Sequence, residues 1–215
     1  MSKSFHILST GVSLITNLQR RKAVIAGVDV STIKLSNDAK WRELLSDQAF
    51  LEAFYGLFAQ APEESLHQAC AELNTFFRAV KGQNPSHVEV YLFGTKTAVN
   101  ELVRRAIERI LGERGYLLCA PYEISGYFGE RSLGEEVAEN AFTKGIKELI
   151  DRLVTLANRK KQGGYRVYFN PTGGLKAHVM ATALAAYLTS SEVYYMNEEF
   201  GDIVFLPFAD LRIQL

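Results

Sequence analysis

The sequence predicts an α/β protein with a largely parallel sheet covered by helices on both faces, formed as a single domain over residues 1–215. The main observation is a repeated unit, in which a short apolar run ends in a glycine-containing turn and a helical pattern follows. The three clearest units start with strands expected at 5–9, 87–93 and 165–169, and their turns contain Gly11, Gly94 and Gly173. Right-handed crossovers between parallel strands place all such turns at one edge of the sheet. We therefore expect three segments that are distant in sequence to meet there.

The remaining elements follow from the spacing of apolar residues and from the residues at which helices start and stop. Helices are expected over 14–21, 39–60, 62–82, 99–110, 135–160 and after 176, and strands over 115–121, 192–196 and 203–206. Pro62 followed by two glutamates marks the start of one helix, and Gly82 marks its end. The last two strands are close enough in sequence to form a hairpin. Residues 22–35 show no clear period, so no element is assigned to them.

Charge and composition exclude several classes of protein. The balance of 24 basic against 24 acidic residues argues against a protein that binds long nucleic acid through many phosphate contacts, but it allows a small anionic ligand in a local pocket. Cys70 and Cys119 are too far apart for a disulfide framework or a zinc site, and no histidines or carboxylates have metal-ligand spacing. We expect no metal and no cofactor. Without a signal-peptide pattern or a membrane-spanning apolar run, we expect a cytoplasmic protein that does not bind membranes.

The segment Asn170-Pro171-Thr172-Gly173-Gly174-Leu175-Lys176 joins an expected strand to an expected helix. Its two glycines allow a ligand to approach the backbone, Thr172 is expected to cap the helix, and the first N–H groups of the helix face the same space. Lys176 opposes the helix dipole unless an anion is bound nearby. The alternative is an ordinary tight turn with a solvated lysine. The spacing of a phosphate-binding P-loop is absent.

Two more polar turns are expected at the same edge of the sheet. The first strand leads into Thr10-Gly11-Val12-Ser13, and the strand at 87–93 leads into Gly94-Thr95-Lys96-Thr97. We expect these turns and the 170–176 segment, here called the lysine turn, to form one pocket. The expected ligand contacts are Thr10, Gly11, Val12, Thr95, Lys96, Asn170, Thr172, Gly173 and Gly174. A glycine-rich loop at 126–134 carries Tyr127 and Phe128, which either stack on an unpaired base or pack beneath the loop.

These motifs resemble those of the CRISPR-associated Rossmann-fold (CARF) proteins of type III CRISPR systems, and within them the small ring nucleases. The resemblance rests on Gly11-Val-Ser-Leu-Ile-Thr-Asn17, on the 170–176 segment, and on Tyr194-Tyr195-x-x-Glu198-Glu199-Phe200 leading into residues 203–207. It implies a Rossmann-like fold and a homodimer that binds a cyclic oligoadenylate, either cyclic tetra-adenylate or cyclic hexa-adenylate, across its interface. By position in the motifs, Ser13 and Lys176 match the two residues that ring nucleases use for catalysis.

The chemistry that the resemblance implies is attack of a ribose 2′-hydroxyl on its own 3′-phosphate. This reaction gives a 2′,3′-cyclic phosphate without a metal or an external water, and it needs positioning and charge stabilisation. Lys176 and the N–H groups of Gly173 and Gly174 would stabilise the charge, while Ser13 would orient the 2′-hydroxyl or bond a phosphate oxygen. No strong general base is evident in the sequence, so we expect a slow enzyme.

Two alternatives from other classes remain open. The first is a CARF sensor that holds the ligand without cutting it, alone or as the regulatory domain of a larger effector. No arginine precedes a histidine at the spacing of a HEPN ribonuclease, the effector often attached to CARF domains. The second is an unrelated nucleotide-dependent α/β enzyme, but the Gly-x-Gly-x-x-Gly fingerprint is absent.

Overall fold

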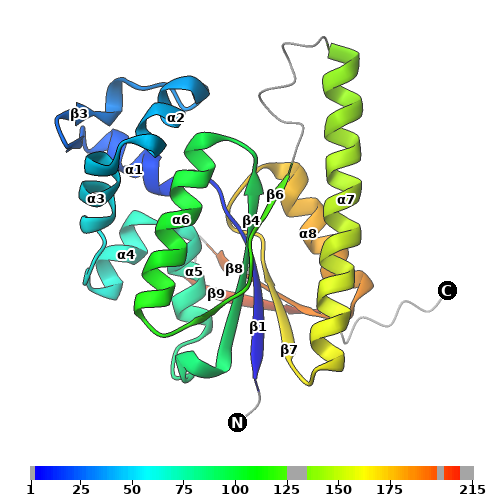
Figure 1. Ribbon diagram of the computed structural model, residues 1–215. Helices are drawn as coiled ribbons and strands as arrows, with labels where there is room; N and C mark the ends of the chain where they lie inside the picture. The colour runs from blue at the N-terminus through cyan, green and yellow to red at the C-terminus, as the bar shows by residue number, and fades with distance from the viewer. Residues whose placement is uncertain (1–2, 125–134, 198–200, 209–215) are drawn as a thin grey trace.

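One mostly parallel sheet forms the centre of the protein, as seen in a computed structural model that describes residues 3–124, 135–197 and 201–208 (Figure 1). Within these residues the strand order is β5-β4-β1-β7-β8-β9, with β6 also paired to β4. All neighbours are parallel except β8 and β9, which form an antiparallel hairpin. The strands are β1 (Ser4–Ser9), β4 (Val88–Thr95), β5 (Leu117–Leu118), β6 (Tyr122–Ile124), β7 (Arg166–Asn170), β8 (Glu192–Asn197) and β9 (Asp202–Pro207). The predicted α/β class is confirmed, and the sheet is Rossmann-like.

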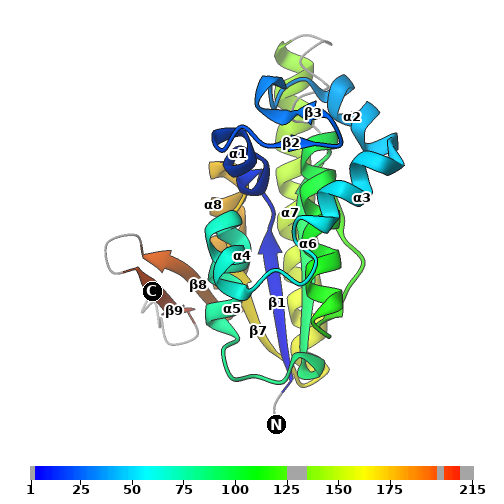
Figure 2. The same ribbon diagram turned by 90° about the vertical axis from the view of Figure 1, so that its left-hand side faces the viewer.

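Helices cover both faces of this sheet. They are α1 (Ser13–Arg20), α2 (Asp38–Ser46), α3 (Gln48–Gly56), α4 (Glu63–Ala69), α5 (Ala71–Ala79), α6 (Ala98–Glu113), α7 (Glu135–Gln162) and α8 (Lys176–Leu188). Short 3-10 turns occur at Val30–Thr32 and Pro85–His87. In Figure 1, α1 to α6 lie on one side of the strands, and α7 and α8 lie on the other. Figure 2 shows the β8–β9 hairpin beside α5, which contacts both of its strands.

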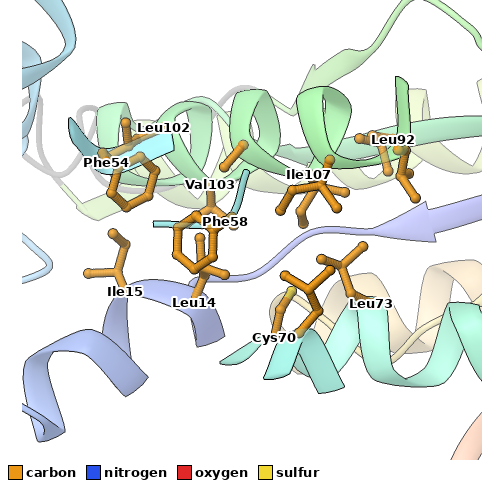
Figure 3. Packing of buried hydrophobic residues seen from close by; sticks show 14 of the residues in the cluster. Leu14, Ile15, Phe54, Phe58, Cys70, Leu73, Leu92, Leu102, Val103 and Ile107 are labelled. Atoms are coloured by element: carbon orange, nitrogen blue, oxygen red, sulfur yellow. The ribbon is translucent and has the colours of Figure 1, made fainter. Parts of the chain in front are cut away.

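The central strand β1 is buried on both faces because its side chains alternate between two apolar cores. Phe5 and Ile7 belong to the core beneath α7 and α8, whereas Leu8 belongs to the core beneath α1 to α6. Figure 3 shows part of the second core, where Phe54 and Phe58 lie close to Leu14, Leu102 and Val103. This two-sided burial explains why the strand has a continuous apolar run rather than an alternating pattern.

The predicted helix over 39–60 is two helices, since Asp47 adopts an extended conformation and accepts a hydrogen bond from the Phe50 amide as the N-cap of α3. The predicted helix over 62–82 is also interrupted, at Cys70, where φ is −142° and ψ is 116°. Neither interruption is marked by proline or glycine, so periodicity alone did not reveal it. The second interruption determines the direction in which the start of α5 points.

The other differences concern short edge elements. Residues 22–35 contain a small hairpin formed by β2 (Val24–Ile25) and β3 (Val28–Asp29), followed by the first 3-10 turn. The strand expected at 115–121 is limited to the short β5, and β6 starts after Pro121, which lacks the N–H that continuous pairing requires. The glycine-rich loop with Tyr127 and Phe128 lies outside the described residues. In the described part of the chain, no helix is long and apolar enough to cross a membrane.

Candidate functional site

A cavity of about 340 Å³ lies at the carboxyl edge of the sheet, where β1, β4 and β7 end. Its walls are the three predicted turns, the beginning of α5 and one leucine from the 22–35 segment. The lining residues are Thr10, Gly11, Val12, Ser13, Leu35, Ala71, Glu72, Thr95, Thr97, Val99, Asn100, Thr172, Gly173, Gly174 and Leu175. The chain leaves β1 for β4 on one side and later returns to β7 on the other, so the cavity is at the switch point where α/β sheets bind ligands.

The turn after β1 is held to β4 and α6 by buried hydrogen bonds. The Thr10 hydroxyl donates to the Phe93 carbonyl over 2.9 Å, so this side chain faces the sheet. The Asn100 side-chain amide donates to the carbonyls of Thr10 at 2.9 Å and Gly11 at 3.1 Å. The Thr97 hydroxyl caps α6 by accepting a hydrogen bond from the backbone N–H of Asn100 at 3.3 Å. These bonds fix the backbone of the first turn relative to the second.

Ser13 is bonded to Glu72, a residue that the sequence did not single out. The Ser13 hydroxyl donates to Glu72 Oε2 at 2.5 Å, and the Gly11 amide donates to Glu72 Oε1 at 2.7 Å. The Cys70 thiol, at 3.2 Å from Oε2, is a third donor. Burial, and then the charge of Glu72, raise the pKa of this thiol well above its ordinary value, so it stays protonated. Glu72 itself is only 1% exposed.

The turns after β1 and β7 pack directly against each other. A Cβ atom added to Gly173 would lie 2.5 Å from the Ser9 carbonyl oxygen and 2.7 Å from the Gly11 nitrogen. A Cβ added to Gly11 would lie 2.7 Å from the Gly174 nitrogen. Gly174 also has a positive φ of 92°, which favours glycine. The glycines are therefore required for two backbones to touch, and Glu72 Oε1 lies at this junction.

Asn170 and Thr172 stabilise the lysine turn. The amide and hydroxyl of Thr172 donate to Asn170 Oδ1 at 3.0 and 2.5 Å, which closes an Asx-type turn. Thr172 is therefore not the helix cap that we predicted. The N-cap position of α8 is Leu175, and no side chain caps this helix. Its first N–H groups are left for solvent or a ligand.

All of the predicted site residues line the cavity except Lys96, Asn170 and Lys176. Asn170 is buried beneath the turn with 1% of its surface exposed. Lys96 and Lys176 are exposed, and each is next in sequence to a lining residue, Thr95 and Leu175 respectively. Among the described residues, no acidic side chain forms an ion pair with either lysine. The two lysines are thus rim residues, available to a ligand that extends beyond the cavity.

Two histidines are buried, His178 near this edge of the sheet and His6 within the sheet. His178, on α8, has no exposed surface, and burial lowers its pKa to about 4. Its Nδ1 lies on the same side of Gly174 as the buried Ser9 hydroxyl. His6 is buried in β1 beside Tyr194, whose hydroxyl is 3.1 Å from Nδ1, and burial lowers its pKa to about 3. Both rings are therefore neutral near pH 7.

Glu72 and Asn100 are the functional candidates that the sequence did not reveal. A continuous helix over 62–82 would place Glu72 outside the apolar face that contains Leu73 and Phe77. The break at Cys70 instead makes Glu72 the second residue of α5 and turns it toward Ser13. The polar groups of the cavity are hydroxyls, amides and this one carboxylate. In the part of the chain that the structure describes, no three His, Cys, Asp or Glu side chains gather to form a metal site.

The fold and the cavity together define an α/β protein of the Rossmann-like class with a candidate site at the carboxyl edge of its sheet. Residues 67–209, more than half of the chain, match the CRISPR-associated protein family Cas_APE2256, and the protein belongs to this family. The matched region starts in α4 and includes Glu72 and the turns after β4 and β7. The turn that carries Ser13 precedes it.

Proposed function

We propose that this protein is a ring nuclease that binds a cyclic oligoadenylate, with cyclic tetra-adenylate as the preferred substrate, and cleaves it by attack of a ribose 2′-hydroxyl. Its role would be to end the signal that this messenger carries in type III CRISPR immunity. The observation that carries the proposal is the junction of the two glycine turns, where Ser13 and the start of α8 border one cavity. The CRISPR-associated family and the motif resemblance to CARF ring nucleases supply the substrate class.

The geometry allows a division of roles between the two sides of the cavity. On one side, Ser13 presents a hydroxyl that is held in place by Glu72 and by the Ala71 amide, which donates to Ser13 Oγ at 3.2 Å. On the other side, Gly174 and the uncapped N-terminus of α8 present backbone N–H groups, which suit a phosphate. The 2′-hydroxyl would lie at Ser13 and the scissile phosphate at the glycine turn, with Lys176 adding positive charge from the rim.

The size of the ligand supports a dimer. A ring of four nucleotides is larger than one 340 Å³ cavity, and it has twofold symmetry, so two copies of the site facing each other would contact both halves equally. The rim of the cavity continues into an exposed apolar stripe on α8, formed by Met180, Leu184 and Leu188 at intervals of one helical turn. We assign this stripe to the contact between two copies of the chain, because α8 starts at the cavity and would bring two cavities together.

Replacing Leu184 with glutamate should therefore produce monomers and abolish ligand binding, since charge on the stripe would disfavour burial. Leu57, an exposed residue at the end of α3, offers a matched control. Leu57→Glu should leave both properties unchanged. Light scattering measures the mass, and calorimetry measures the affinity for cyclic tetra-adenylate. A wild-type protein that stays monomeric with and without ligand would contradict the dimer.

The enzyme and the non-cleaving sensor are separated by a comparison of rate and affinity. Wild-type protein and Ser13→Ala are incubated with cyclic tetra-adenylate or cyclic hexa-adenylate, and products are resolved by chromatography. If Ser13 orients the attacking hydroxyl, the variant loses rate at saturating ligand and keeps most of its affinity. If the wild-type protein binds the ring but leaves it intact over many hours, the sensor is the correct assignment.

A further inference from the structure

Glu72 occupies an unusual position for an acidic residue, since it is almost fully buried and faces a cavity that we assign to an anionic ligand. All three of its partners are hydrogen-bond donors: the Gly11 amide, the Ser13 hydroxyl and the Cys70 thiol. Both of its oxygens accept, as expected for an ionised carboxylate. In the described part of the chain no lysine or arginine forms an ion pair with it. Its charge is balanced by hydrogen bonds alone.

These contacts limit what Ser13 can still bind. A serine hydroxyl has one proton to donate and two lone pairs to accept with. The proton is used by Glu72 at 2.5 Å, and one lone pair is used by the Ala71 amide at 3.2 Å. The remaining capacity of Ser13 is a single acceptor position. A ligand group that bonds Ser13 must therefore be a donor, which a ribose hydroxyl is and an ionised phosphate oxygen is not.

We propose that Glu72 is the proton acceptor of this site and acts through Ser13, a role that rests on the proposed ring-nuclease function. The ribose 2′-hydroxyl donates to Ser13 Oγ, and Ser13 donates to Glu72 Oε2. As the 2′-oxygen attacks phosphorus, its proton moves to Ser13 Oγ while the Ser13 proton moves to Glu72. This relay supplies the general base that no single motif in the sequence provides.

The step is balanced without a co-reactant. The bond from the 2′-oxygen to phosphorus forms, and the bond from phosphorus to the 5′-oxygen breaks with its electron pair on that oxygen. The 5′-oxygen takes a proton from a solvent water, and Glu72 returns its proton to the resulting hydroxide. The net reaction opens the ring to a 2′,3′-cyclic phosphate and a 5′-hydroxyl, with no water consumed.

A negative charge at this position has a second consequence, which separates the relay from a structural role. Because Glu72 repels the phosphates of the ligand, Glu72→Gln should bind a non-cleavable ring at least as tightly as the wild-type protein does. The same variant should cleave the natural ring at least tenfold more slowly at saturation, since its amide accepts no proton. A residue that only supports the turns would lose affinity and rate together.

The experiment compares the wild-type protein, Glu72→Gln, Glu72→Asp, Ser13→Ala and the double variant Ser13→Ala/Glu72→Gln. Cleavage of cyclic tetra-adenylate is measured in single turnovers, and affinity is measured with the 2′-O-methyl ring. Thermal unfolding shows whether each variant is folded. Glu64→Gln, at an exposed position in the first turn of α4, is the control and should match the wild-type protein.

The relay predicts that Glu72→Asp recovers part of the rate, because it restores a carboxylate, and that the double variant is no slower than the slower single variant. Equal rates for Glu72→Gln and the wild-type protein, or a parallel loss of rate and affinity in Glu72→Gln with no recovery in Glu72→Asp, would overturn the relay and leave the ring nuclease in place. A wild-type protein that does not cleave the ring would overturn both.

Discussion

Acid should destabilise this protein because two of its histidines are buried in neutral form. Burial lowers the pKa of His178 to about 4 and that of His6 to about 3, whereas an unfolded histidine titrates near 6.5. Between these values the unfolded chain binds a proton at each histidine and the folded protein does not. Folding stability therefore falls as the pH drops below about 6.5, and it is independent of these groups above that value.

The magnitude follows from the size of that window. Each histidine contributes a loss of about 1.4 kcal/mol per pH unit below its unfolded pKa, so a change from about pH 7.5 to about pH 5 costs roughly 2 kcal/mol per residue and roughly 4 kcal/mol for both. Most carboxylates titrate below this range and contribute little to it. Such a loss is a large share of the 5–15 kcal/mol that is typical of folded proteins.

Urea unfolding at the two pH values measures this loss directly. In His178→Leu the pH-dependent loss should fall to about half of the wild-type value, because only His6 remains. Comparing each protein with itself at the two pH values cancels the change in packing that the replacement causes. An unfolding free energy that is equal at both pH values in the wild-type protein would refute the reasoning. So would a His178→Leu variant that loses as much stability as the wild-type protein.

Two further substitutions test the site with matched controls. Lys176→Ala should weaken binding of the 2′-O-methyl ring by about 1–1.5 kcal/mol, roughly fivefold to tenfold. Arg159→Ala, in an exposed position at the end of α7, should not change the affinity. Equal effects of the two substitutions in calorimetry would mean that the rim lysine is an ordinary surface charge. Gly173→Ala should destabilise the protein by about 3 kcal/mol and abolish cleavage, because its Cβ has no space between the two turns. Gly82→Ala is the control, because a Cβ there meets open space although φ is 80°; it should lower the stability by about 1 kcal/mol and leave cleavage intact. Similar stability and similar activity in the two variants would contradict the packed junction.

Sequence patterns were sufficient to predict the position of the cavity, because that position depends on topology. Apolar strands followed by glycine turns indicate a parallel sheet, and right-handed connections then bring Gly11, Thr95 and Gly173 to one edge. The glycines of these turns were predicted to let a ligand approach the backbone. What the sequence could not show is that Gly11 and Gly173 pack directly against each other.

The details of the site depended on conformations that periodicity does not encode. Glu72 became part of it through one extended residue, Cys70, inside an apparently continuous helical pattern. Lys176 was correctly placed in the first turn of α8, but side-chain exposure puts it at the rim. At the end of α7, Lys160 pairs with Glu89 at 2.5 Å and Lys161 donates to the Thr189 and Ser190 carbonyls, although a basic run at a helix end is typical of a solvated surface. Such contacts depend on tertiary packing.

The central claim, that this cavity opens a cyclic oligoadenylate by 2′-hydroxyl attack, is tested most directly by the products formed in excess chelator. Mass spectrometry of wild-type reactions with cyclic tetra-adenylate should show linear adenylates that end in a 2′,3′-cyclic phosphate, with the same rate with and without EDTA. The 2′-O-methyl ring should bind and remain intact, since its nucleophile is blocked. Cleavage of that analogue, or activity that is lost with EDTA and returns with magnesium or manganese, would show that an external water attacks and would contradict the roles assigned to Ser13, Glu72 and Lys176.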